Sequence, residues 1–410
     1  MRIALTSNGP GEFSGWVRPL VAALERLAPE TEIALFFVPD DYATGREDEV
    51  ARKLFPEIAV FAARDYLRFA LGRGLAGAPA SSDVVLYLGG DLMHASRVRA
   101  RLGGVLATYR FSSRRLAKSL VRAYAFNASN AATLARTGLG PDRIEIVGNL
   151  AVDGALGEAA GAFATRSGDD PRIAPNGVLI LPGARKYEIA HLVPFFVQVA
   201  LKLRALAPDV PVAFAISPFT DAGELDRALS TGGHPSVWGA RGSVVEGLEG
   251  LWLQPEGDHP PIPVVRDAMR YASRARMALT IPGTKCIELA ALGVPTMVCA
   301  PLNAPEMVVI NGPLQYLDRI PFLGVPLKRA MVLGVDKRFP LSAQPNIDAG
   351  EELMPELRGT LMPGHVARRV AEYAGDDAAR AAAAQRLRAL YIDHAGAAER
   401  MARSLLALGP

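Results

Sequence analysis

The sequence predicts an α/β protein made of two halves of the βαβ type and a helical C-terminal tail. Short apolar segments alternate with helix-like segments through most of the 410 residues, which is typical of parallel sheets. Glycine-rich turns follow several apolar segments, where a strand would pass into a helix. A stretch rich in small residues, 154–176, predicts a flexible linker between two domains.

The first half opens with an apolar strand at 2–6, a glycine-rich loop and a helix around 16–27. Further strands are predicted at 33–38, 83–88, 123–127 and 144–147. The strand at 83–88 runs into Gly89, Gly90 and Asp91, so a carboxylate is expected at its carboxyl end. These elements predict a first domain over residues 1–165.

The second half is organised around residues 277–295, which read as a strand, a turn and a helix. Gly283 lies in the turn, Thr284 is predicted to cap the helix, and a second strand follows at 296–300. A helix that begins at the carboxyl end of a strand offers free N–H groups and partial positive charge to a diphosphate. Glu288, one turn into that helix, can accept two hydroxyl groups of a ribose or sugar. The alternative is an ordinary βα unit with a solvated glutamate.

Two earlier strands complete the second half, at 177–181 and 212–216. The first is followed by a Pro-Gly-Ala-Arg turn that ends on Arg185, and then by a helix from about Glu188. We expect a second domain over 176–375 and a helical tail over 376–410. The tail is predicted to pack on the first domain or on a partner subunit. Two such domains would face each other across a cleft between the carboxyl ends of both sheets.

Composition excludes several classes of protein. The net charge is +3, the two cysteines lie in apolar segments, and the six histidines are scattered without ligand spacing. We therefore predict no disulfide framework, no metal and no cofactor, in a reducing cytoplasm. The sequence has no run of about 18 apolar residues, so no membrane span is predicted. The chain begins directly with a strand, so no signal peptide is expected.

The first glycine-rich loop, SNGPGEFSG at 7–15, comes close to a dinucleotide-binding fingerprint. Asp40 follows the second strand, as a ribose-binding acid would. A nicotinamide-binding Rossmann domain is thus an alternative for the first half, although it leaves the second half unexplained. No Gly-Lys-Ser/Thr follows, so the loop is not a P-loop. Glu12 and Ser14 are expected at the mouth of the helix.

Five segments, in order over most of the chain, resemble motifs of the lipid-A-disaccharide synthase family of glycosyltransferases. GEFSG at 11–15 looks like its GEASGD loop, and VGNL at 147–150 with Asp153 looks like its VGHPL-D segment. LPGARKYEI at 181–189 is close to LPGSRxxEI. Residues 283–295 are similar to GTATLEAALLGVP. PNI at 345–347 and PEL at 355–357 resemble elements near the family's C-terminus.

The resemblance implies the GT-B architecture, with two Rossmann-like domains. It implies an inverting transfer of an acylated glucosamine from a UDP-sugar donor to an acylated sugar phosphate, as in lipid A biosynthesis. It also implies a set of substrate-binding positions: Ser14, Gly15, Asn149, Arg185, Gly283, Thr284, Glu288, Asn346 and Glu356.

The departures from the family pattern bear on the acceptor. Trp16 stands where the family has aspartate, Asn149 where it has histidine, and Arg358 where it usually has glutamine. Residues 303–329 are also unusual for the family. These positions are expected on the acceptor or lipid side, whereas the donor motifs are largely kept. A divergent relative that uses a different glycolipid acceptor is therefore an alternative.

The predicted chemistry needs a stabilised leaving diphosphate and a base for the acceptor hydroxyl. The sequence has no Asp-x-Asp, so the helix start at Gly283 and Thr284 and a cation must hold the diphosphate. Arg185 is the best cation, because a guanidinium binds phosphate oxygens in a bidentate way. Asp91 is the first candidate base, and the family has an essential aspartate in a similar place. A helix cap is the alternative for Asp91, and Glu12 is the second candidate base.

Eight basic residues gather between Arg97 and Arg122 with very few acids: Arg97, Arg99, Arg101, Arg110, Arg114, Arg115, Lys118 and Arg122. They favour the inner-leaflet membrane surface or a phosphorylated glycolipid over nucleic acid, for which no motif is present. The alternative is a solvated helix face. Residues 66–75 and 320–335 are further candidate lipid-facing segments, the latter otherwise a buried hairpin or loop. We predict a cytoplasmic, peripherally membrane-associated enzyme, with a homodimer left open.

Two other functions stay open on the sequence alone. The same fold and nucleotide site would suit a UDP-sugar epimerase, which acts on soluble substrates. A non-catalytic UDP-sugar-binding relative would keep the nucleotide site without a base.

Overall fold

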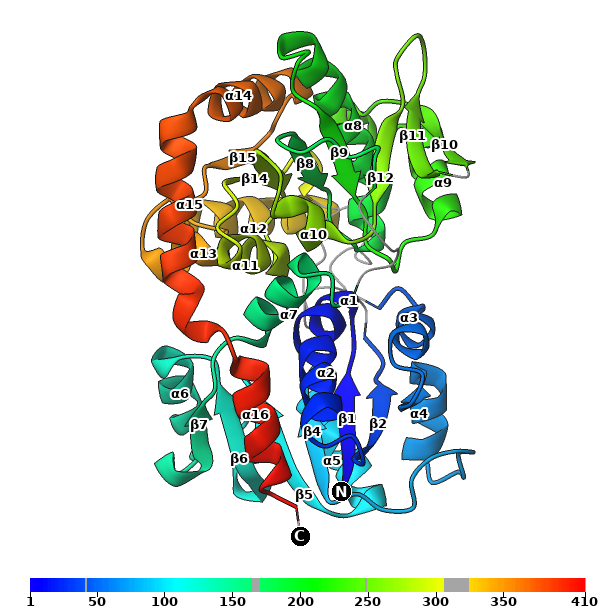
Figure 1. The fold of residues 1–410 in the computed structure, drawn as a ribbon, viewed down its shortest axis with the longest axis vertical. Helices are drawn as coiled ribbons and strands as arrows, with labels where there is room; N and C mark the ends of the chain where they lie inside the picture. The colour runs from blue at the N-terminus through cyan, green and yellow to red at the C-terminus, as the bar shows by residue number, and fades with distance from the viewer. Residues whose placement is uncertain (41–42, 164–169, 248, 306–323, 410) are drawn as a thin grey trace. The chain divides into compact units, whose positions relative to one another are not determined.

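The chain folds as two compact units in a computed structural model, which describes residues 1–410 except 41–42, 164–169, 248, 306–323 and 410 (Figure 1). Unit 1 comprises Met1–Gly157 together with Tyr391–Pro410, and unit 2 comprises Glu158–Leu390. Each unit has one sheet with helices packed on it. The predicted α/β class, with helices at the C-terminus, is confirmed.

Unit 1 has a seven-stranded sheet in the order β3-β2-β1-β4-β5-β6-β7, and every neighbouring pair in it is parallel. The strands are β1 (Arg2–Ser7), β2 (Glu32–Phe37), β3 (Ala59–Phe61), β4 (Val84–Tyr87), β5 (Val105–Tyr109), β6 (Leu120–Ala125) and β7 (Ile144–Ile146). The chain order reverses between β1 and β4. In open parallel sheets, ligands bind outside the carboxyl ends of the strands at such a point.

The helices of unit 1 follow from apolar positions at helical spacing. In α5 (Leu92–Leu102) the buried residues are Leu92, Ala95, Val98 and Leu102, which form one stripe against the sheet. The other helices are α1 (Pro10–Glu12), a π-helix (Phe13–Val17), α2 (Arg18–Leu27), α3 (Glu47–Leu54), α4 (Ala63–Ala70), α6 (Ala128–Ala135), α7 (Leu150–Ala159) and α16 (Ala397–Leu406).

The C-terminal segment belongs to unit 1, although 233 residues of unit 2 come before it. Helix α16 packs on α2 through a stripe that includes the buried Ala397, Met401 and Leu405. Arg400 Nε donates to the carbonyl oxygen of Val147 at 2.8 Å, and Ser404 Oγ donates to Glu145 at 2.6 Å. These contacts tie the last helix to the end of β7.

Unit 2 has an eight-stranded mixed sheet in the order β10-β11-β12-β9-β8-β13-β14-β15. Six strands are parallel, whereas β10 and β11 form an antiparallel hairpin on β12. The strands are β8 (Val178–Leu181), β9 (Val212–Ala215), β10 (Gly242–Gly247), β11 (Gly250–Pro255), β12 (Ile262–Val265), β13 (Met277–Thr280), β14 (Thr296–Pro301) and β15 (Glu356–Gly359). The order reverses between β8 and β13, which places a second topological switch point there.

Helix α8 (Lys186–Leu206) supplies much of the unit 2 core. Ile189, Val193, Phe196, Ala200 and Leu203 alternate at spacings of four and three and are fully buried. The other helices are α9 (Ala222–Thr231), α10 (Ala268–Ala272), α11 (Thr284–Ala291), α12 (Gly324–Arg338), α13 (Gln344–Ala349), α14 (Pro363–Gly375) and α15 (Asp377–Tyr391).

By length and composition, α8 is the one helix in the described part of the chain that passes as a membrane span. Half of the apolar stretch is buried inside the fold. Core helices commonly pass the same test, so this observation is weak support for a span.

The predicted linker at 154–176 is wrong in its first part. Residues 150–159 form α7, and Gly154 lies inside that helix. A Cβ atom on Gly154 would lie 3.1 Å from the carbonyl oxygen of Ser14, so the glycine permits close packing of α7 on the π-helix. Composition suggested flexibility, but here the small residues serve helix packing.

Candidate functional site

In unit 2, the loops that follow β8 and β13 lie at the same edge of the sheet. The two strands are paired neighbours in parallel register, with Thr280 opposite Leu181. Helices α8 and α11 therefore both begin at this edge. A Cβ atom on Gly183 would lie 2.7 Å from Ile281 Cδ1, so the loops touch. Two helix N-termini at adjacent strand ends make an electropositive setting for an anion.

The start of α8 is fixed by Glu188. Its carboxylate accepts hydrogen bonds from the backbone N–H groups of Ala184, at 2.8 Å, and Arg185, at 2.9 Å. Gly183 has φ +107°, and a Cβ atom there would lie 2.2 Å from the Glu188 carboxylate, so only glycine fits. The Arg185 side chain is 48% exposed, and its Nη1 lies 3.9 Å from Glu188. This guanidinium is within reach of a ligand at the helix start.

The start of α11 differs from the prediction. Gly283 is the N-cap residue and no side chain caps the helix, whereas Thr284 was predicted to be the cap and is instead the first helical residue. Among the described residues, no atom beyond its chain neighbours lies within 4 Å of a Cβ atom built on Gly283. The first backbone N–H groups of α11 have no partner within the helix itself.

Glu288 is more enclosed than the prediction of a sugar-binding carboxylate requires. Its side chain is 2% exposed and Lys285 Nζ lies 2.5 Å from Oε2. Because a buried carboxylate needs a partner, Lys285 neutralises Glu288 in this structure. Binding of a sugar hydroxyl by Glu288 stays a prediction.

Asn346 and Glu356 have structural contacts that the resemblance did not indicate. Asn346 is fully buried; its amide nitrogen donates to Met354 O and to Glu356 Oε1, both at 2.8 Å. Glu356 also accepts hydrogen bonds from the backbone N–H groups of Ser342 and Ala343 at 2.9–3.0 Å. In this structure the pair holds the start of α13 against β15, and the contact of Asn346 with a substrate stays a prediction.

In unit 1, the loops after β1 and β4 meet at the switch point. A Cβ atom on Gly89 would lie 2.2 Å from Asn8 Oδ1 and 3.0 Å from Glu12 Cγ, so the two loops are in close contact. Asp91 is exposed and its Oδ1 accepts a hydrogen bond from Met93 N at 2.7 Å. Asp91 is therefore the N-cap of α5, as the alternative interpretation held, and its exposed carboxylate stays open to solvent.

The negative charges of three carboxylates act on the hydroxyl group of Tyr87. Burial raises the pKa of Tyr87, and the negative charges of Glu12, Asp91 and Asp40 raise it further. The Tyr87 hydroxyl donates to Gly90 O at 2.7 Å. The two predicted base candidates, Glu12 and Asp91, are thus brought together at the carboxyl-end edge of the unit 1 sheet.

The residues of the predicted GEFSG loop lie in helical structure. Ser14, Gly15 and Trp16 belong to the π-helix between α1 and α2, a form that is rare and frequent at functional sites. Gly15 is buried where Gly154 of α7 approaches it, which is a packing role. Ser14 is partly exposed.

Asn149 is also a structural residue in this fold. Its side chain is 1% exposed, and Oδ1 accepts a hydrogen bond from Ala151 N at 3.1 Å at the start of α7. Substrate binding by Asn149 stays a prediction. The neighbouring Leu150 N–H donates to the hydroxyl group of Tyr109 at 3.1 Å.

Neither cysteine is a nucleophile in this structure. Burial raises the pKa of Cys286 to about 12, and burial also raises the pKa of Cys299. Both thiols therefore stay protonated near neutral pH. In the part of the chain that the structure describes, no group of three or more His, Cys, Asp or Glu side chains could hold a metal ion.

The predicted lipid-facing segments divide into core and surface. Tyr66 and Phe69 are buried, whereas Leu71 is exposed. Residues 320–323 lie outside the described residues; the rest of the 320–335 segment is in α12, so a hairpin at 324–335 is wrong. Within the basic segment 97–122, Arg99 donates to Gly104 O and Arg122 lies 3.7 Å from Glu145. Arg114, Arg115 and Lys118 are exposed.

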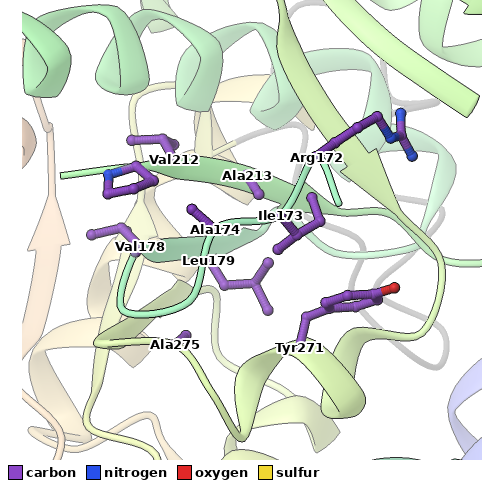
Figure 2. A pocket seen from close by; sticks show the side chains of 11 residues that line it. Arg172, Ile173, Ala174, Val178, Leu179, Val212, Ala213, Tyr271 and Ala275 are labelled. Carbon is purple, nitrogen blue, oxygen red and sulfur yellow. The ribbon is translucent and has the colours of Figure 1, made fainter. Parts of the chain in front are cut away.

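A small cavity of about 30 Å³ lies in unit 2 at the beginnings of β8 and β9, the opposite ends of those strands from the loops described above (Figure 2). It is lined by residues such as Ile173, Val178, Val212 and Tyr271. Its volume suits about one or two water molecules. It is too small for a nucleotide.

Comparison with known proteins shows the fold. No protein-family model matches the sequence, and no curated protein matches it. Among solved structures, a putative UDP-N-acetylglucosamine 2-epimerase from Listeria monocytogenes matches with a TM-score of 0.58 and 13% identity, covering 99% of this chain and 96% of that one. A UDP complex of S. aureus MnaA matches with a TM-score of 0.59 and 13% identity, covering 99% and 97%.

A third solved structure covers both chains almost completely. UDP-GlcNAc 2-epimerase from Neisseria meningitidis, bound to UDP-GlcNAc, matches with a TM-score of 0.54 and 11% identity, covering 99% of this chain and 100% of that one. At these identities the likeness establishes the fold. The chain has the GT-B fold, with two Rossmann-like α/β units, as the sequence predicted.

Proposed function

We propose that this protein is an enzyme that binds a UDP-sugar through unit 2. The observation that carries the proposal is the pair of helix starts, α8 and α11, at the adjacent ends of β8 and β13. The exposed guanidinium of Arg185 adds a cation there. Two of the structural neighbours are described as bound to UDP or UDP-GlcNAc, which supports this class of ligand.

Glycosyl transfer is the first reaction that we propose for this site. A base, Glu12 or Asp91, takes the proton of an acceptor hydroxyl, whose oxygen forms a bond to the anomeric carbon of the donor sugar. The bond from that carbon to the diphosphate breaks, and UDP leaves with its charge held by Arg185 and the α11 start. The sequence resemblance supports an acylated glucosamine as the transferred group and an acylated sugar phosphate as the acceptor.

Epimerisation of a UDP-sugar is the second candidate. The structural neighbours named above support it, because the Neisseria meningitidis protein is described as a UDP-GlcNAc 2-epimerase and the Listeria monocytogenes protein as a putative one. It needs the same nucleotide site and no acceptor.

One experiment separates the two reactions. Purified protein is incubated with UDP-2,3-diacylglucosamine and diacylglucosamine 1-phosphate, and in parallel with UDP-N-acetylglucosamine alone. A disaccharide and UDP, found by mass spectrometry, would establish transfer. A second UDP-sugar in the parallel sample, seen by proton NMR, would establish epimerisation. If neither product forms and calorimetry detects no UDP binding, the proposal is wrong.

Variants assign the base. Glu12→Gln and Asp91→Asn each remove a carboxylate and keep the shape of the side chain. Loss of product with only one of them identifies the base, because general-base catalysis contributes about 10²–10⁴-fold. Asp65→Asn, on α4, is a matched control that removes a carboxylate from another part of unit 1.

Peripheral binding to an anionic membrane forms part of the glycosyltransferase proposal. It is supported by the exposed Arg114, Arg115 and Lys118 and by Phe111, whose side chain is 49% exposed in the same segment. Co-sedimentation with anionic vesicles and its absence with neutral vesicles are expected. Failure to bind either kind of vesicle would favour a soluble substrate and hence the epimerase.

A further inference from the structure

Arg110 has an unusual backbone conformation at the carboxyl end of β5. Its φ is +66°, which side chains other than glycine rarely adopt. The conformation is held on both sides: Arg110 N donates to Tyr124 O at 2.8 Å, and Arg110 O accepts from Asn130 Nδ2 at 3.0 Å. Backbone strain that the fold maintains in this way is typical of functional positions.

The guanidinium group of Arg110 packs against aromatic rings and has no carboxylate partner among the described residues. Its Cζ lies 4.3 Å from the ring centroid of Phe126 and 5.4 Å from that of Trp16. Among the described residues, no carboxylate lies within ion-pair distance of it. In the same unit Arg52 pairs with Asp48 at 2.5 Å. Arg110 is thus a partly buried, immobilised cation whose hydrogen-bond donors are available.

Trp16 supplies a second donor beside it. Its indole Nε1 is buried and has no hydrogen-bond partner in the described structure. The ring packs edge-on against Tyr109, with centroids 5.4 Å apart, and lies 6.4 Å from Phe111. A buried donor without an acceptor is destabilising, so its position next to Arg110 calls for a ligand with several acceptor oxygens.

Charges of opposite sign act on Tyr87. The carboxylates of Glu12 and Asp91 raise the pKa of Tyr87, and the Arg110 guanidinium lowers it, so all of them act on one phenol. The Tyr87 and Phe111 rings are in edge contact, with centroids 6.2 Å apart. A ligand here would have a hydroxyl group toward the acids and an anionic group toward the arginine.

We propose that Arg110 and Trp16 form an anion-binding subsite in unit 1 that takes the phosphate group of a phosphorylated sugar. A phosphate monoester offers several oxygens to a guanidinium fork and an indole N–H, whereas a neutral sugar offers neither charge nor that geometry. The assignment of this sugar as the acceptor rests on the proposed function. The subsite itself does not.

Tryptophan fluorescence tests the subsite directly. The full chain is titrated with glucosamine 1-phosphate and, separately, with glucosamine. Only the phosphorylated sugar is expected to change the emission. The sequence has three tryptophans, so Trp16→Phe identifies the signal and should abolish the change.

Arg110→Gly removes the cation and suits the backbone, because glycine tolerates a positive φ. We expect it to weaken binding of glucosamine 1-phosphate by about 10- to 100-fold, as loss of a charge-assisted hydrogen bond would. Arg114→Gln removes an exposed cation of the same segment and should bind as the wild type does. Equal affinity for the two sugars, no binding of either, or unchanged affinity in Arg110→Gly would overturn the subsite.

Calorimetry with UDP on the same proteins tests the proposed function separately from the anion-binding subsite. Arg110→Gly should bind UDP as the wild type does, because Arg110 belongs to unit 1. If the wild type does not bind UDP, the proposed function is wrong. The result with glucosamine 1-phosphate still decides the subsite. Diacylglucosamine 1-phosphate in detergent then distinguishes the sources: tighter binding than the soluble sugar supports a lipid-linked phosphate, and equal binding supports a soluble one.

Discussion

The carboxylate of Asp153 accepts a hydrogen bond from the backbone N–H of Ala398 at 2.6 Å, although 245 residues separate them in the chain. The same carboxylate accepts from Gly396 N at 2.7 Å. Gly396 is the N-cap position of α16 and has φ +79°. Asp153, on α7, thus caps a helix from the other end of the sequence and joins the last residues of the chain to unit 1.

Replacing Asp153 should destabilise unit 1. Asp153→Ala leaves two N–H groups of α16 without an acceptor, and we expect the free energy of unfolding to fall by about 2–3 kcal/mol. Urea denaturation measures this. Glu399→Gln, which removes exposed ion pairs with Arg26 and Arg403, should change stability far less, because exposed ion pairs contribute little. Equal effects of the two variants would show that Asp153 does not anchor α16.

Glu356→Gln should reduce stability and leave UDP affinity unchanged. The Glu356 carboxylate accepts from Ser342, Ala343 and Asn346, and a glutamine would turn an NH₂ group toward donors. We expect a loss of about 2–4 kcal/mol, because buried polar groups would be left unpaired. Thermal unfolding gives the stability, and calorimetry at a temperature where the variant is folded gives the affinity. A variant of wild-type stability with weakened UDP binding would restore the substrate-binding role that the sequence suggested.

The sequence predicted the fold well because hydrophobic alternation and glycine turns are local signals. Strands such as β8, β13 and β14 begin and end within about two residues of their predicted limits. The β10–β11 hairpin was missed, although Gly247 and Gly250 flank its turn. The residues of β10 are partly or fully exposed, and in β11 partly exposed residues alternate with buried ones, so neither strand has a continuous apolar run.

The candidate site was harder to predict, because a motif gives positions and not burial. Asn149 and Asn346 are motif residues, yet both are buried and bonded within the fold. Arg110 was one of eight basic residues in a segment, and its residue type gave no sign of its backbone conformation or its aromatic neighbours. Long-range packing decides both properties, so no local pattern could separate these residues from their neighbours.

Arg185→Ala should weaken UDP binding by about 1–3 kcal/mol, as loss of a charge-assisted pair would. Its guanidinium is half-exposed at the start of α8. Lys186→Ala, one residue further on and also exposed, is the control for general loss of positive charge. Calorimetry measures both. Unchanged affinity in Arg185→Ala, or an equal loss in Lys186→Ala, would remove Arg185 from the nucleotide site.

Gly183→Ala should damage the same site through the backbone. The added Cβ would meet Glu188 at 2.2 Å, and φ +107° is unfavourable for alanine. We expect a loss of stability of about 2–4 kcal/mol from backbone strain and weakened hydrogen bonds to Glu188. Gly138→Ala has a similar φ of +95° and open space around it, so strain alone should cost about 1 kcal/mol. Thermal unfolding that ranks the two variants equally would contradict the steric argument.

Acid should destabilise unit 2 through His191. The Nδ1 atom of His191 accepts a hydrogen bond from His234 N at 3.1 Å, which requires an unprotonated Nδ1. Burial lowers the pKa of His191, and the neighbouring His234 lowers it further. The unfolded chain therefore takes up the proton first as the pH falls. The stability due to His191 is complete above its unfolded pKa of about 6.5 and is lost as the pH falls toward the lower folded value.

The His191→Gln variant isolates this contribution. A glutamine oxygen can accept the same N–H bond and does not titrate between about pH 5 and about pH 8. We expect the melting temperature of the wild type to fall more steeply than that of His191→Gln as the pH drops from about 7 to about 5.5. His365→Gln, at an exposed position of the same unit, should keep the wild-type slope. Parallel curves for the wild type and His191→Gln would show that another group causes the acid sensitivity.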